Sequence, residues 1–405
     1  MTAQEKIQKY DQAQLLSFVD ELSPEESEAF EKQIEKIDFS VLEHLTNRNE
    51  EIKKGDLSPL AAMELAEIDK NRDRFENIGL EAIRKGRVGA VLLAGGMGTR
   101  LGSDDPKGMY NIGVTKDLYI FQCLINNLTD VVRKAGKFIH LFVMTSDLNY
   151  EKTTAFFENM NYFGYPKEYI TFFKQEMAPT CDYNGKIFLE EPGKVSVSPN
   201  GNGGWFLSMM KSGILDKIKS NKIEFLNVFA VDNVLQRICD PVFIGATVSE
   251  GRAVGAKVVK KNDPDERVGV ICLEDGKPSI VEYYELTDEL RLACDERGER
   301  LYNFGVILNY LFKVDDLENI VKYSLPYHVV EKKITHIDED GNIVKPDKPN
   351  GYKFEQLVLD MIHLAKDCLP FEVVREKEFA PIKNKEGIDS VESARVLLQM
   401  NGVEI

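Results

Sequence analysis

We expect the fold of this chain to be organised around the stretch VLLAGGMGTRLGSDDPKGM, from Val91 to Met109. Its first four residues are apolar and form a run short enough for a buried strand, and glycines follow at positions 95, 96 and 98. Glycine tolerates positive φ and has no Cβ, so such a loop can bring main-chain N–H groups close to an anion. Arg100 and Lys107 add positive charge. The stretch therefore predicts a phosphate-binding loop after a buried strand.

Two common phosphate loops do not fit this stretch. The dinucleotide fingerprint requires a glycine three residues after its second glycine, but Gly98 is followed by Leu101 at that position. The Walker loop requires Gly-Lys-Ser/Thr, but Lys107 is followed by Gly108. The pattern G-G-x-G-T-R-L followed by P-K-G instead resembles the signature loop of nucleotidyltransferases that make nucleotide sugars.

The composition is that of a soluble globular protein. The chain has 405 residues, of which 43% are hydrophobic and 29% charged, and it has no apolar run of about 18 residues and no apolar signal core at its N-terminus. We therefore expect a cytoplasmic protein of one or two domains. The net charge of −16 argues against nucleic-acid and membrane partners. Six cysteines without a C-x-x-C pair predict reduced thiols rather than zinc sites or disulfides.

Residues 1–86 are predicted to form a helical N-terminal region with a packing or interface role. Apolar residues recur at helix spacing between Leu15 and Leu22, and the run Ser23-Pro24-Glu25-Glu26 supplies an N-cap, a proline at N1 and a capping-box glutamate. Ser58-Pro59 predicts a further helix start, and a last helix is expected to end at Gly86.

From Val88 onward, strand-like and helix-like stretches alternate. Strands are predicted at 138–144, 170–173 and 225–231 and a helix at 151–157, a pattern typical of a mostly parallel sheet with crossover helices. We assign the catalytic domain to residues 87–370 and a short C-terminal segment to residues 371–405. In such sheets ligands bind beyond the carboxyl ends of the strands.

Polar residues stand at several of these strand ends. Asp232 follows a predicted strand, where its carboxylate suits a Mg²⁺ ligand, although a helix cap would explain it equally well. Glu282 and Asn303 are each expected at the end of a strand-like run, where they suit sugar hydroxyls and amides or local backbone groups. Lysines 353 and 383 lie in predicted proline-containing loops, where lysines are usually solvated.

Taken together, these runs resemble the eukaryotic-type UDP-N-acetylglucosamine pyrophosphorylases from the N-terminus to about residue 385. The motifs that carry the resemblance appear in the family's order: LLAGGMGTRLG, PKGMY, MTS, GKIFLEE, NGNGG, VDN, GAKVV, VEYYE, NFGVI, KPDKPNG and PIKN. The resemblance implies an α/β, Rossmann-like nucleotidyltransferase fold, in which a GT-A-like mixed sheet is flanked by helices.

The resemblance also implies a single-displacement reaction in which UTP and N-acetylglucosamine 1-phosphate give UDP-N-acetylglucosamine and pyrophosphate, with Mg²⁺ or Mn²⁺. The attacking phosphate oxygen is already ionised, so the site must align two anions and neutralise charge, and no general base is needed. The resemblance assigns catalysis to Arg100, Lys107 and Lys383 and the metal to Asp232. It assigns substrate binding to Leu93, Ala94, Gly95, Gly96, Gln175, Gly201, Asn202, Glu282, Tyr283, Asn303 and Lys353.

Within that set, the resemblance divides the substrate between the residues. The main chain of Leu93 to Gly96 and the side chain of Gln175 hold the uracil, and Gly201 seats the nucleoside. Lys353 reaches the UTP phosphates, and Lys383 meets the sugar phosphate. The sugar site is lined by Asn202, Glu282, Tyr283 and Asn303.

The sequence departs from the family pattern in two places. It ends at Ile405, whereas larger relatives continue into a C-terminal domain, so their oligomer contacts do not carry over and we favour a monomer. Met97 replaces the family's glutamine. Two alternatives to the main interpretation stay open: a broad-specificity UDP-sugar or UDP-glucose pyrophosphorylase, and a nucleotide-sugar-binding regulator without catalysis. The retained Arg100, Lys107, Asp232, Lys353 and Lys383 count against the regulator.

Overall fold

The computed structural model describes residues 1–45 and 55–405, which form two compact units. Unit 1 consists of residues 1–45, 175–204 and 325–358, and unit 2 of residues 55–174, 205–324 and 359–405. Each unit therefore combines three separate segments of the chain. The predicted domain limits at residues 86 and 370 stay a prediction.

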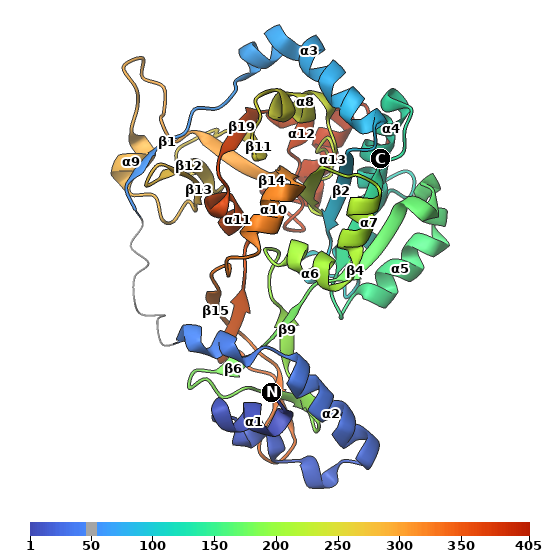
Figure 1. Cartoon of the computed structure of the whole chain (residues 1–405), viewed down its shortest axis with the longest axis vertical. Helices are drawn as coiled ribbons and strands as arrows, with labels where there is room; N and C mark the ends of the chain where they lie inside the picture. Colours follow the sequence, from blue (N-terminus) through green and yellow to red (C-terminus); the bar gives the residue numbers. More distant parts are fainter. Residues whose placement is uncertain (46–54) are drawn as a thin grey trace. The chain divides into compact units, whose positions relative to one another are not determined.

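Unit 2 is built on a mixed sheet, which confirms the predicted α/β fold class (Figure 1). Four neighbouring strands, in the order β10, β2, β3 and β4, are parallel, and β14 continues the sheet beyond β10 in the antiparallel direction. Its ten strands are β1 (Leu57–Pro59), β2 (Val88–Leu93), β3 (His140–Thr145), β4 (Ile170–Lys174), β10 (Phe225–Ala230), β11 (Val254–Lys260), β12 (Val270–Glu274), β13 (Lys277–Val281), β14 (Phe304–Lys313) and β19 (Cys368–Glu372).

The register of the two central strands places their carboxyl ends side by side. Every residue of β2 is buried, as expected for a strand covered on both faces. Leu93, the last residue of β2, pairs with Ala230, the last residue of β10. The loops that follow these two strands therefore start at the same edge of the sheet.

Helices flank this sheet. Figure 1 shows α3 and α8 side by side, and two glycines allow this close crossing. A Cβ on Gly79 would lie 1.9 Å from the carbonyl oxygen of Pro241, and a Cβ on Gly245 would lie 1.7 Å from that of Phe75. The helices of unit 2 are α3 (Leu65–Arg84), α4 (Ile120–Ala135), α5 (Tyr150–Asn159), α6 (Trp205–Lys211), α7 (Ile214–Ser220), α8 (Pro241–Ser249), α9 (Asp288–Leu292), α10 (Val314–Ile320), α11 (Val358–Leu364), α12 (Arg375–Glu378) and α13 (Val391–Met400).

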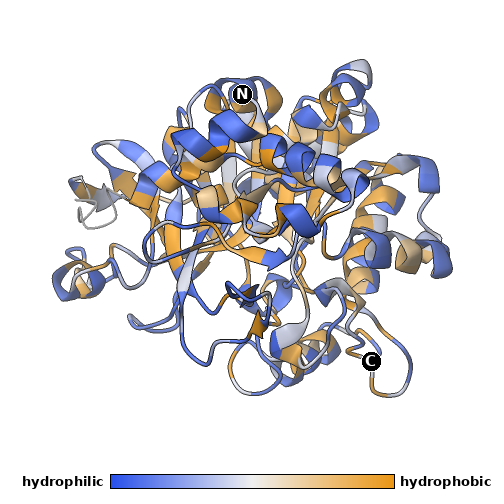
Figure 2. Ribbon diagram, turned by 90° about the horizontal axis from the view of Figure 1, so that it is seen from below, coloured by the Kyte–Doolittle hydropathy of each residue, from blue (hydrophilic) through white to orange (hydrophobic). Residues whose placement is uncertain are grey.

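The hydropathy of the residues agrees with a buried sheet that is flanked by helices. The strands of the sheet are mostly hydrophobic, whereas many of the helices alternate between hydrophobic and hydrophilic residues (Figure 2). Helix α4, for example, buries Phe121, Leu124 and Leu128 in the core of unit 2. This is the 3.6-residue pattern of a helix with one face on a core.

Unit 1 combines helices from the N-terminus with short strands from two later segments. Both N-terminal α-helices, α1 and α2, begin with a capping box, at Thr2 and at the predicted Ser23. Phe30 and Ile34 of α2 pack with Leu189 and Val195 in one apolar cluster. The elements are α1 (Ala3–Lys9), α2 (Pro24–Lys36), β5 (Met177–Pro179), β6 (Cys181–Asp182), β7 (Leu189–Glu191), β8 (Lys194–Val195), β9 (Val197–Pro199), β15 (His328–Lys332), β16 (His336–Ile337), β17 (Ile343–Val344) and β18 (Gly351–Glu355).

Two expectations for the N-terminal region were wrong. The apolar residues from Leu15 to Leu22 form two short 3-10 helices, Ala13–Leu16 and Val19–Glu21, instead of one α-helix. Ser58-Pro59 does not begin a helix, because Leu57–Pro59 pairs with β12 as an edge strand, and the next helix begins at Leu65. That helix ends at Arg84, and Gly86 has a φ of +72°, so the predicted stop is confirmed.

Within residues 1–45 and 55–405, no helix is both long enough and apolar enough to cross a membrane.

Candidate functional site

The loop after β2 is folded back on itself by main-chain hydrogen bonds. The N–H of Lys107 donates to the carbonyl oxygen of Gly96 at 3.2 Å, and the N–H of Gly98 donates to that of Asp105 at 2.8 Å. Met97 and Pro106 form a bridge between the two arms, so Met97 contributes main-chain contacts here. Arg100 lies in the 3-10 helix Thr99–Leu101. The loop therefore holds Arg100 and Lys107 close to the end of β2.

The glycines of this loop do not all have the positive φ that the sequence predicted. Gly98 has a φ of −81°, and neither it nor Gly96 is among the residues with positive φ, which contradicts the expected reason for these glycines. Gly102 is the loop residue with positive φ, at +77°. A Cβ on Gly96 would meet no atom within 4 Å. The main chain at Gly96 is thus open to a ligand, which is the property a phosphate or base site requires.

Two polar residues that the sequence did not single out fix the carbonyl groups of this loop. The side-chain amide of Asn149 donates to the carbonyl oxygen of Ala94 at 2.9 Å and lies 3.4 Å from that of Gly96. The hydroxyl of Ser146 donates to the carbonyl oxygen of Gly95 at 3.1 Å. Both residues are buried and follow β3. The place of Ser146 directly after the strand was the available sequence signal, whereas Asn149 lies further on, at the N-cap of α5.

The predicted catalytic and metal residues of unit 2 converge at this edge of the sheet. The ammonium nitrogen of Lys107 lies 3.7 Å from a carboxylate oxygen of Asp232, which follows β10. Burial lowers the pKa of Lys107, Asp232 opposes this shift, and the positive charges of Arg100 and Lys383 lower the pKa further. Three cations and one carboxylate therefore act on one another here. Such a cluster suits a polyanionic ligand, because added negative charge would relieve the repulsion among the cations.

Lys383 is held in place by a neighbour that the sequence did not single out. Its ammonium nitrogen lies 3.0 Å from a carboxylate oxygen of Asp389, and its main-chain N–H donates to the carbonyl oxygen of Asp389 at 2.6 Å. Asp389 has a φ of +54°, a conformation that aspartate adopts more readily than most residues. The predicted loop position of Lys383, between α12 and α13, is confirmed.

Asp232 suits a divalent cation whose other ligands are substrate phosphates and water molecules. Asp232 is only partly exposed and lies beside the cations. In the described part of the chain there is no group of three or more histidine, cysteine, aspartate or glutamate residues that could hold a metal by itself. Mg²⁺ commonly binds through one or two carboxylates, with waters and substrate phosphates as its other ligands, so a single carboxylate is compatible with it.

The predicted sugar residues of unit 2 flank the start of β12. Val270, the first residue of β12, pairs with both Val281 and Gly305. Because β13 ends at Val281, Glu282 directly follows a strand, as predicted. Asn303 precedes β14 instead of ending a strand, because pairing with β11 begins at Phe304. The Oδ1 atom of Asn303 is buried and has no hydrogen-bond partner among the described residues. A buried acceptor without a partner is costly and suits a ligand donor.

Tyr283 lies next to this group at the surface of unit 2. Its side chain is exposed, and the guanidinium of Arg267 lies 5.9 Å from the centre of its ring.

The remaining predicted substrate residues, Gln175, Gly201, Asn202 and Lys353, belong to unit 1. Gly201 has a φ of +86°, and a Cβ there would lie 2.3 Å from the carbonyl oxygen of Gln356, so this position requires glycine. The side-chain oxygen of Asn202 accepts the N–H of Val358 at 2.9 Å. The NGNGG loop is thus anchored on the segment after β18.

Two further residues of unit 1 refine the predicted set. Lys353 lies within β18 and not in a loop, because Gly351–Glu355 pairs with β15. Burial lowers its pKa, the charge of Lys332 lowers it further, and Glu355 acts in the opposite direction. Asn200, which the sequence did not assign to the site, is buried and has an Oδ1 atom without a partner among the described residues.

Comparison with known proteins identifies relatives along almost the whole chain. Residues 32–404 match the sequence profile of the family described as UTP--glucose-1-phosphate uridylyltransferase. The human "UDP-N-acetylhexosamine pyrophosphorylase-like protein 1" is 36% identical over 407 residues, which cover 95% of this chain and 80% of the human protein. The "UDP-N-acetylglucosamine pyrophosphorylase" of Saccharomyces cerevisiae is 37% identical over 408 residues, covering 97% of this chain and 85% of the yeast protein.

A solved structure agrees with these sequence matches. The "uridine diphosphate N-acetylglucosamine pyrophosphorylase" of Trypanosoma brucei, crystallised with an inhibitor, superposes with a TM-score of 0.83 at 28% identity. The match covers 97% of this chain and 83% of the trypanosomal chain. The similarity therefore extends over both units.

Proposed function

This chain belongs to the UTP--glucose-1-phosphate uridylyltransferase family, and from that premise we propose that it makes UDP-N-acetylglucosamine and pyrophosphate from UTP and N-acetylglucosamine 1-phosphate. One observation carries the proposal: Arg100, Lys107, Asp232 and Lys383 converge at the carboxyl ends of β2 and β10. The relatives with more than a third of their residues identical are named for N-acetylhexosamine sugars, which favours this substrate over glucose 1-phosphate.

Transfer of the uridylyl group requires positive charge around the phosphates and no general base. A phosphate oxygen of the sugar 1-phosphate attacks the α-phosphorus of UTP, the bond between that phosphorus and the bridging oxygen to the β-phosphate breaks, and pyrophosphate leaves. No proton has to be removed from the nucleophile, because the sugar phosphate is ionised at neutral pH. The protein must bring two anions together and stabilise the charge that develops in the transition state.

The residues of unit 2 divide this task. Lys107 and Arg100 face the nucleotide phosphates, and Lys383 binds the sugar phosphate and aligns it for attack. Asp232 holds a divalent cation, Mg²⁺ or Mn²⁺. When bound, the cation supplies further neutralisation of the phosphate charge. Lys107 is mostly buried, so its positive charge is less screened than that of a surface lysine.

The substrate's uncharged parts are assigned to the remaining residues. The main chain of Leu93, Ala94, Gly95 and Gly96 binds the uracil, supported by the open face at Gly96. Glu282, Tyr283 and Asn303 bind the sugar, supported by the unpaired buried oxygen of Asn303. The roles of Gln175, Gly201, Asn202 and Lys353 rest on the sequence resemblance.

The proposal is tested by following both products. The purified protein is incubated with UTP, N-acetylglucosamine 1-phosphate and Mg²⁺, and UDP-N-acetylglucosamine and pyrophosphate are quantified separately. We expect both products in equal amounts, and neither when one substrate is omitted. Binding of both substrates without product formation would favour the regulator, and pyrophosphate from UTP alone would indicate a hydrolase.

A further inference from the structure

The segment that carries Lys383 is attached to the end of β10 by two hydrogen bonds of the Asn233 side chain, which we call the double clasp. The side-chain amide of Asn233 donates to the carbonyl oxygen of Glu378 at 2.7 Å, and its Oδ1 atom accepts the N–H of Ala380 at 2.9 Å. One residue earlier, the carbonyl oxygen of Asp232 accepts the N–H of Ile382 at 2.8 Å. The strand end that carries the proposed metal ligand therefore directly holds the residue before Lys383.

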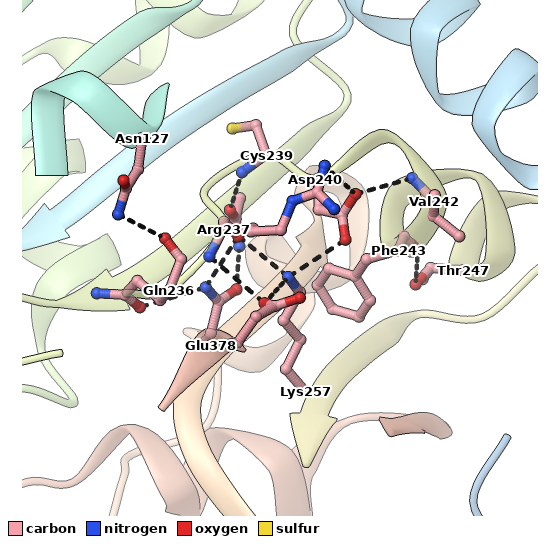
Figure 3. Close-up of polar contacts among 12 residues, drawn as sticks. Asn127, Gln236, Arg237, Cys239, Asp240, Val242, Phe243, Thr247, Lys257 and Glu378 are labelled. Carbon is pink, nitrogen blue, oxygen red and sulfur yellow. Dashed lines mark hydrogen bonds and ion pairs between the residues drawn. The ribbon is translucent and has the colours of Figure 1, made fainter. Parts of the chain in front are cut away.

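The beginning of this segment is anchored by a buried ion cluster (Figure 3). Lys257, on β11, is fully buried, and its ammonium nitrogen lies 2.5 Å from a carboxylate oxygen of Glu378. The same nitrogen lies 3.4 Å from a carboxylate oxygen of Asp240 and donates to the carbonyl oxygen of Arg237 at 3.1 Å. Removing one member would leave a buried charge without its partner, so the cluster strongly favours one position of Glu378.

The double clasp and the buried ion cluster both restrict the main chain from Glu378 to Ile382. Glu378 is fixed from β11 by Lys257, and Ala380 and Ile382 are fixed from β10 by Asn233 and Asp232. None of these groups except Asp232 is assigned to substrate or metal. Asn233 is buried, and its side-chain oxygen and amide both bond this segment, so its contacts are explained by holding the segment in place.

We propose that Asn233 is a positioning residue for Lys383: together with the Lys257–Glu378–Asp240 cluster, it sets the position of the Lys383 ammonium relative to Asp232 and Lys107. The inference rests on the proposed function, because it assigns Lys383 to the transferring phosphate. A shift of about 1 Å in a group that aligns the reactants can cost up to about 10²-fold in rate. Loss of the clasp therefore lowers kcat, while UTP binding, which depends on other residues, changes little.

A double-mutant cycle tests this inference. In Asn233→Ala, kcat falls by about tenfold, and the KM for UTP stays within about threefold of the wild-type value. In the Lys383→Ala background, the same substitution causes little further loss of kcat, because its effect acts through the missing ammonium group. If Asn233→Ala does not fold, Asn233→Ser replaces it in the cycle, because the shorter side chain cannot make both hydrogen bonds but keeps a polar group.

Tyr165→Phe is the matched control. The Tyr165 hydroxyl is buried in unit 2, donates to the carbonyl oxygen of Ile139 at 2.7 Å and accepts the N–H of Ile139 at 3.1 Å. Like Asn233, it gives one hydrogen bond to the main chain and receives one. We expect Tyr165→Phe to lower the unfolding temperature while leaving kcat unchanged. An equal loss of kcat in the control, or multiplicative losses for Asn233→Ala and Lys383→Ala, would overturn the inference.

A second measurement does not depend on turnover. The rate at which an amine reagent labels Lys383, measured by mass spectrometry against the exposed Lys385 in the same molecule, reports how firmly Lys383 is held. The ratio should rise at least threefold in Asn233→Ala and stay unchanged in Tyr165→Phe. If the wild type makes no UDP-sugar, the proposed function fails, whereas an unchanged labelling ratio in Asn233→Ala would contradict the positioning role itself.

Discussion

The ammonium nitrogen of Lys107 lies 3.7 Å from a carboxylate oxygen of Asp232, across the carboxyl ends of two neighbouring parallel strands. The pair joins a proposed phosphate ligand to a proposed metal ligand. The two groups have opposite charges, so each stabilises the other in a partly buried site. Binding of a nucleotide phosphate with its metal would give each of them a second partner of opposite charge.

Loss of either lysine proposed to be catalytic should lower kcat/KM by roughly 10²–10³, which is the effect of removing one charge-stabilising donor from a preorganised site. Lys107→Ala and Lys383→Ala are compared with Lys385→Ala, a nearby exposed lysine without an assigned role. Steady-state kinetics on proteins with unchanged circular dichroism give the answer. Full activity in both site variants would remove these residues from the mechanism.

Activity should require a divalent cation that Asp232 binds. EDTA should abolish turnover, and added Mg²⁺ or Mn²⁺ should restore it. In Asp232→Asn the concentration of Mg²⁺ needed for half-maximal activity should rise by more than tenfold, because an amide oxygen carries no full charge. Turnover that persists in EDTA, or an unchanged Mg²⁺ requirement in Asp232→Asn, would show that this carboxylate is not the metal ligand.

Lys353 should react with an amine reagent at a lower pH than an ordinary lysine does. Burial and the charge of Lys332 lower the pKa of Lys353 below its ordinary value of 10.5. The side chain should therefore lose its proton at a lower pH than a typical lysine, and its labelling by an amine reagent should begin at lower pH. If Lys353 binds UTP phosphates, UTP should raise this pKa and slow the labelling. A labelling midpoint at or above 10.5 without UTP would contradict the structure.

The local elements were largely predictable because short-range patterns decide them. The apolar run before the glycine-rich loop predicts β2, and the Ser23 capping box predicts the start of α2 at Pro24. The strand 225–231 agrees with β10 within one residue. Ser58-Pro59 has the local chemistry of a helix start, but pairing with β12, more than 200 residues away, overrides it.

The parts that could not be predicted depend on contacts between distant segments. Unit 1 assembles three separate stretches of chain, and no local pattern specifies that association. Asn149 and Asn233 look like ordinary turn residues in the sequence, and their roles become visible only when the carbonyl of Ala94 and the N–H of Ala380 lie beside them. Composition and motifs thus located the charged groups, while the groups that hold them in place required the fold.

Discrimination between sugars should depend on Asn303. Its buried and unpaired Oδ1 atom can accept the N–H of an acetamido group while its side-chain N–H groups donate to the acetyl oxygen, whereas the hydroxyl of glucose 1-phosphate at that position can pair with only one of the two. Leaving such a group unpaired costs about 1–3 kcal/mol, or roughly ten- to a hundredfold in kcat/KM. Asn303→Ala should reduce the preference for the N-acetylated sugar by this factor. An unchanged preference in the variant would assign discrimination to another residue.

A competition assay tests the proposed preference for N-acetylglucosamine 1-phosphate. Limiting UTP is supplied with equal concentrations of N-acetylglucosamine 1-phosphate and glucose 1-phosphate, and the two UDP-sugars are separated and quantified. Because the substrates compete for one site, the product ratio equals the ratio of their kcat/KM values. We predict that UDP-N-acetylglucosamine exceeds UDP-glucose by at least about tenfold. Equal amounts would contradict the proposed substrate preference and favour a broad-specificity UDP-sugar pyrophosphorylase.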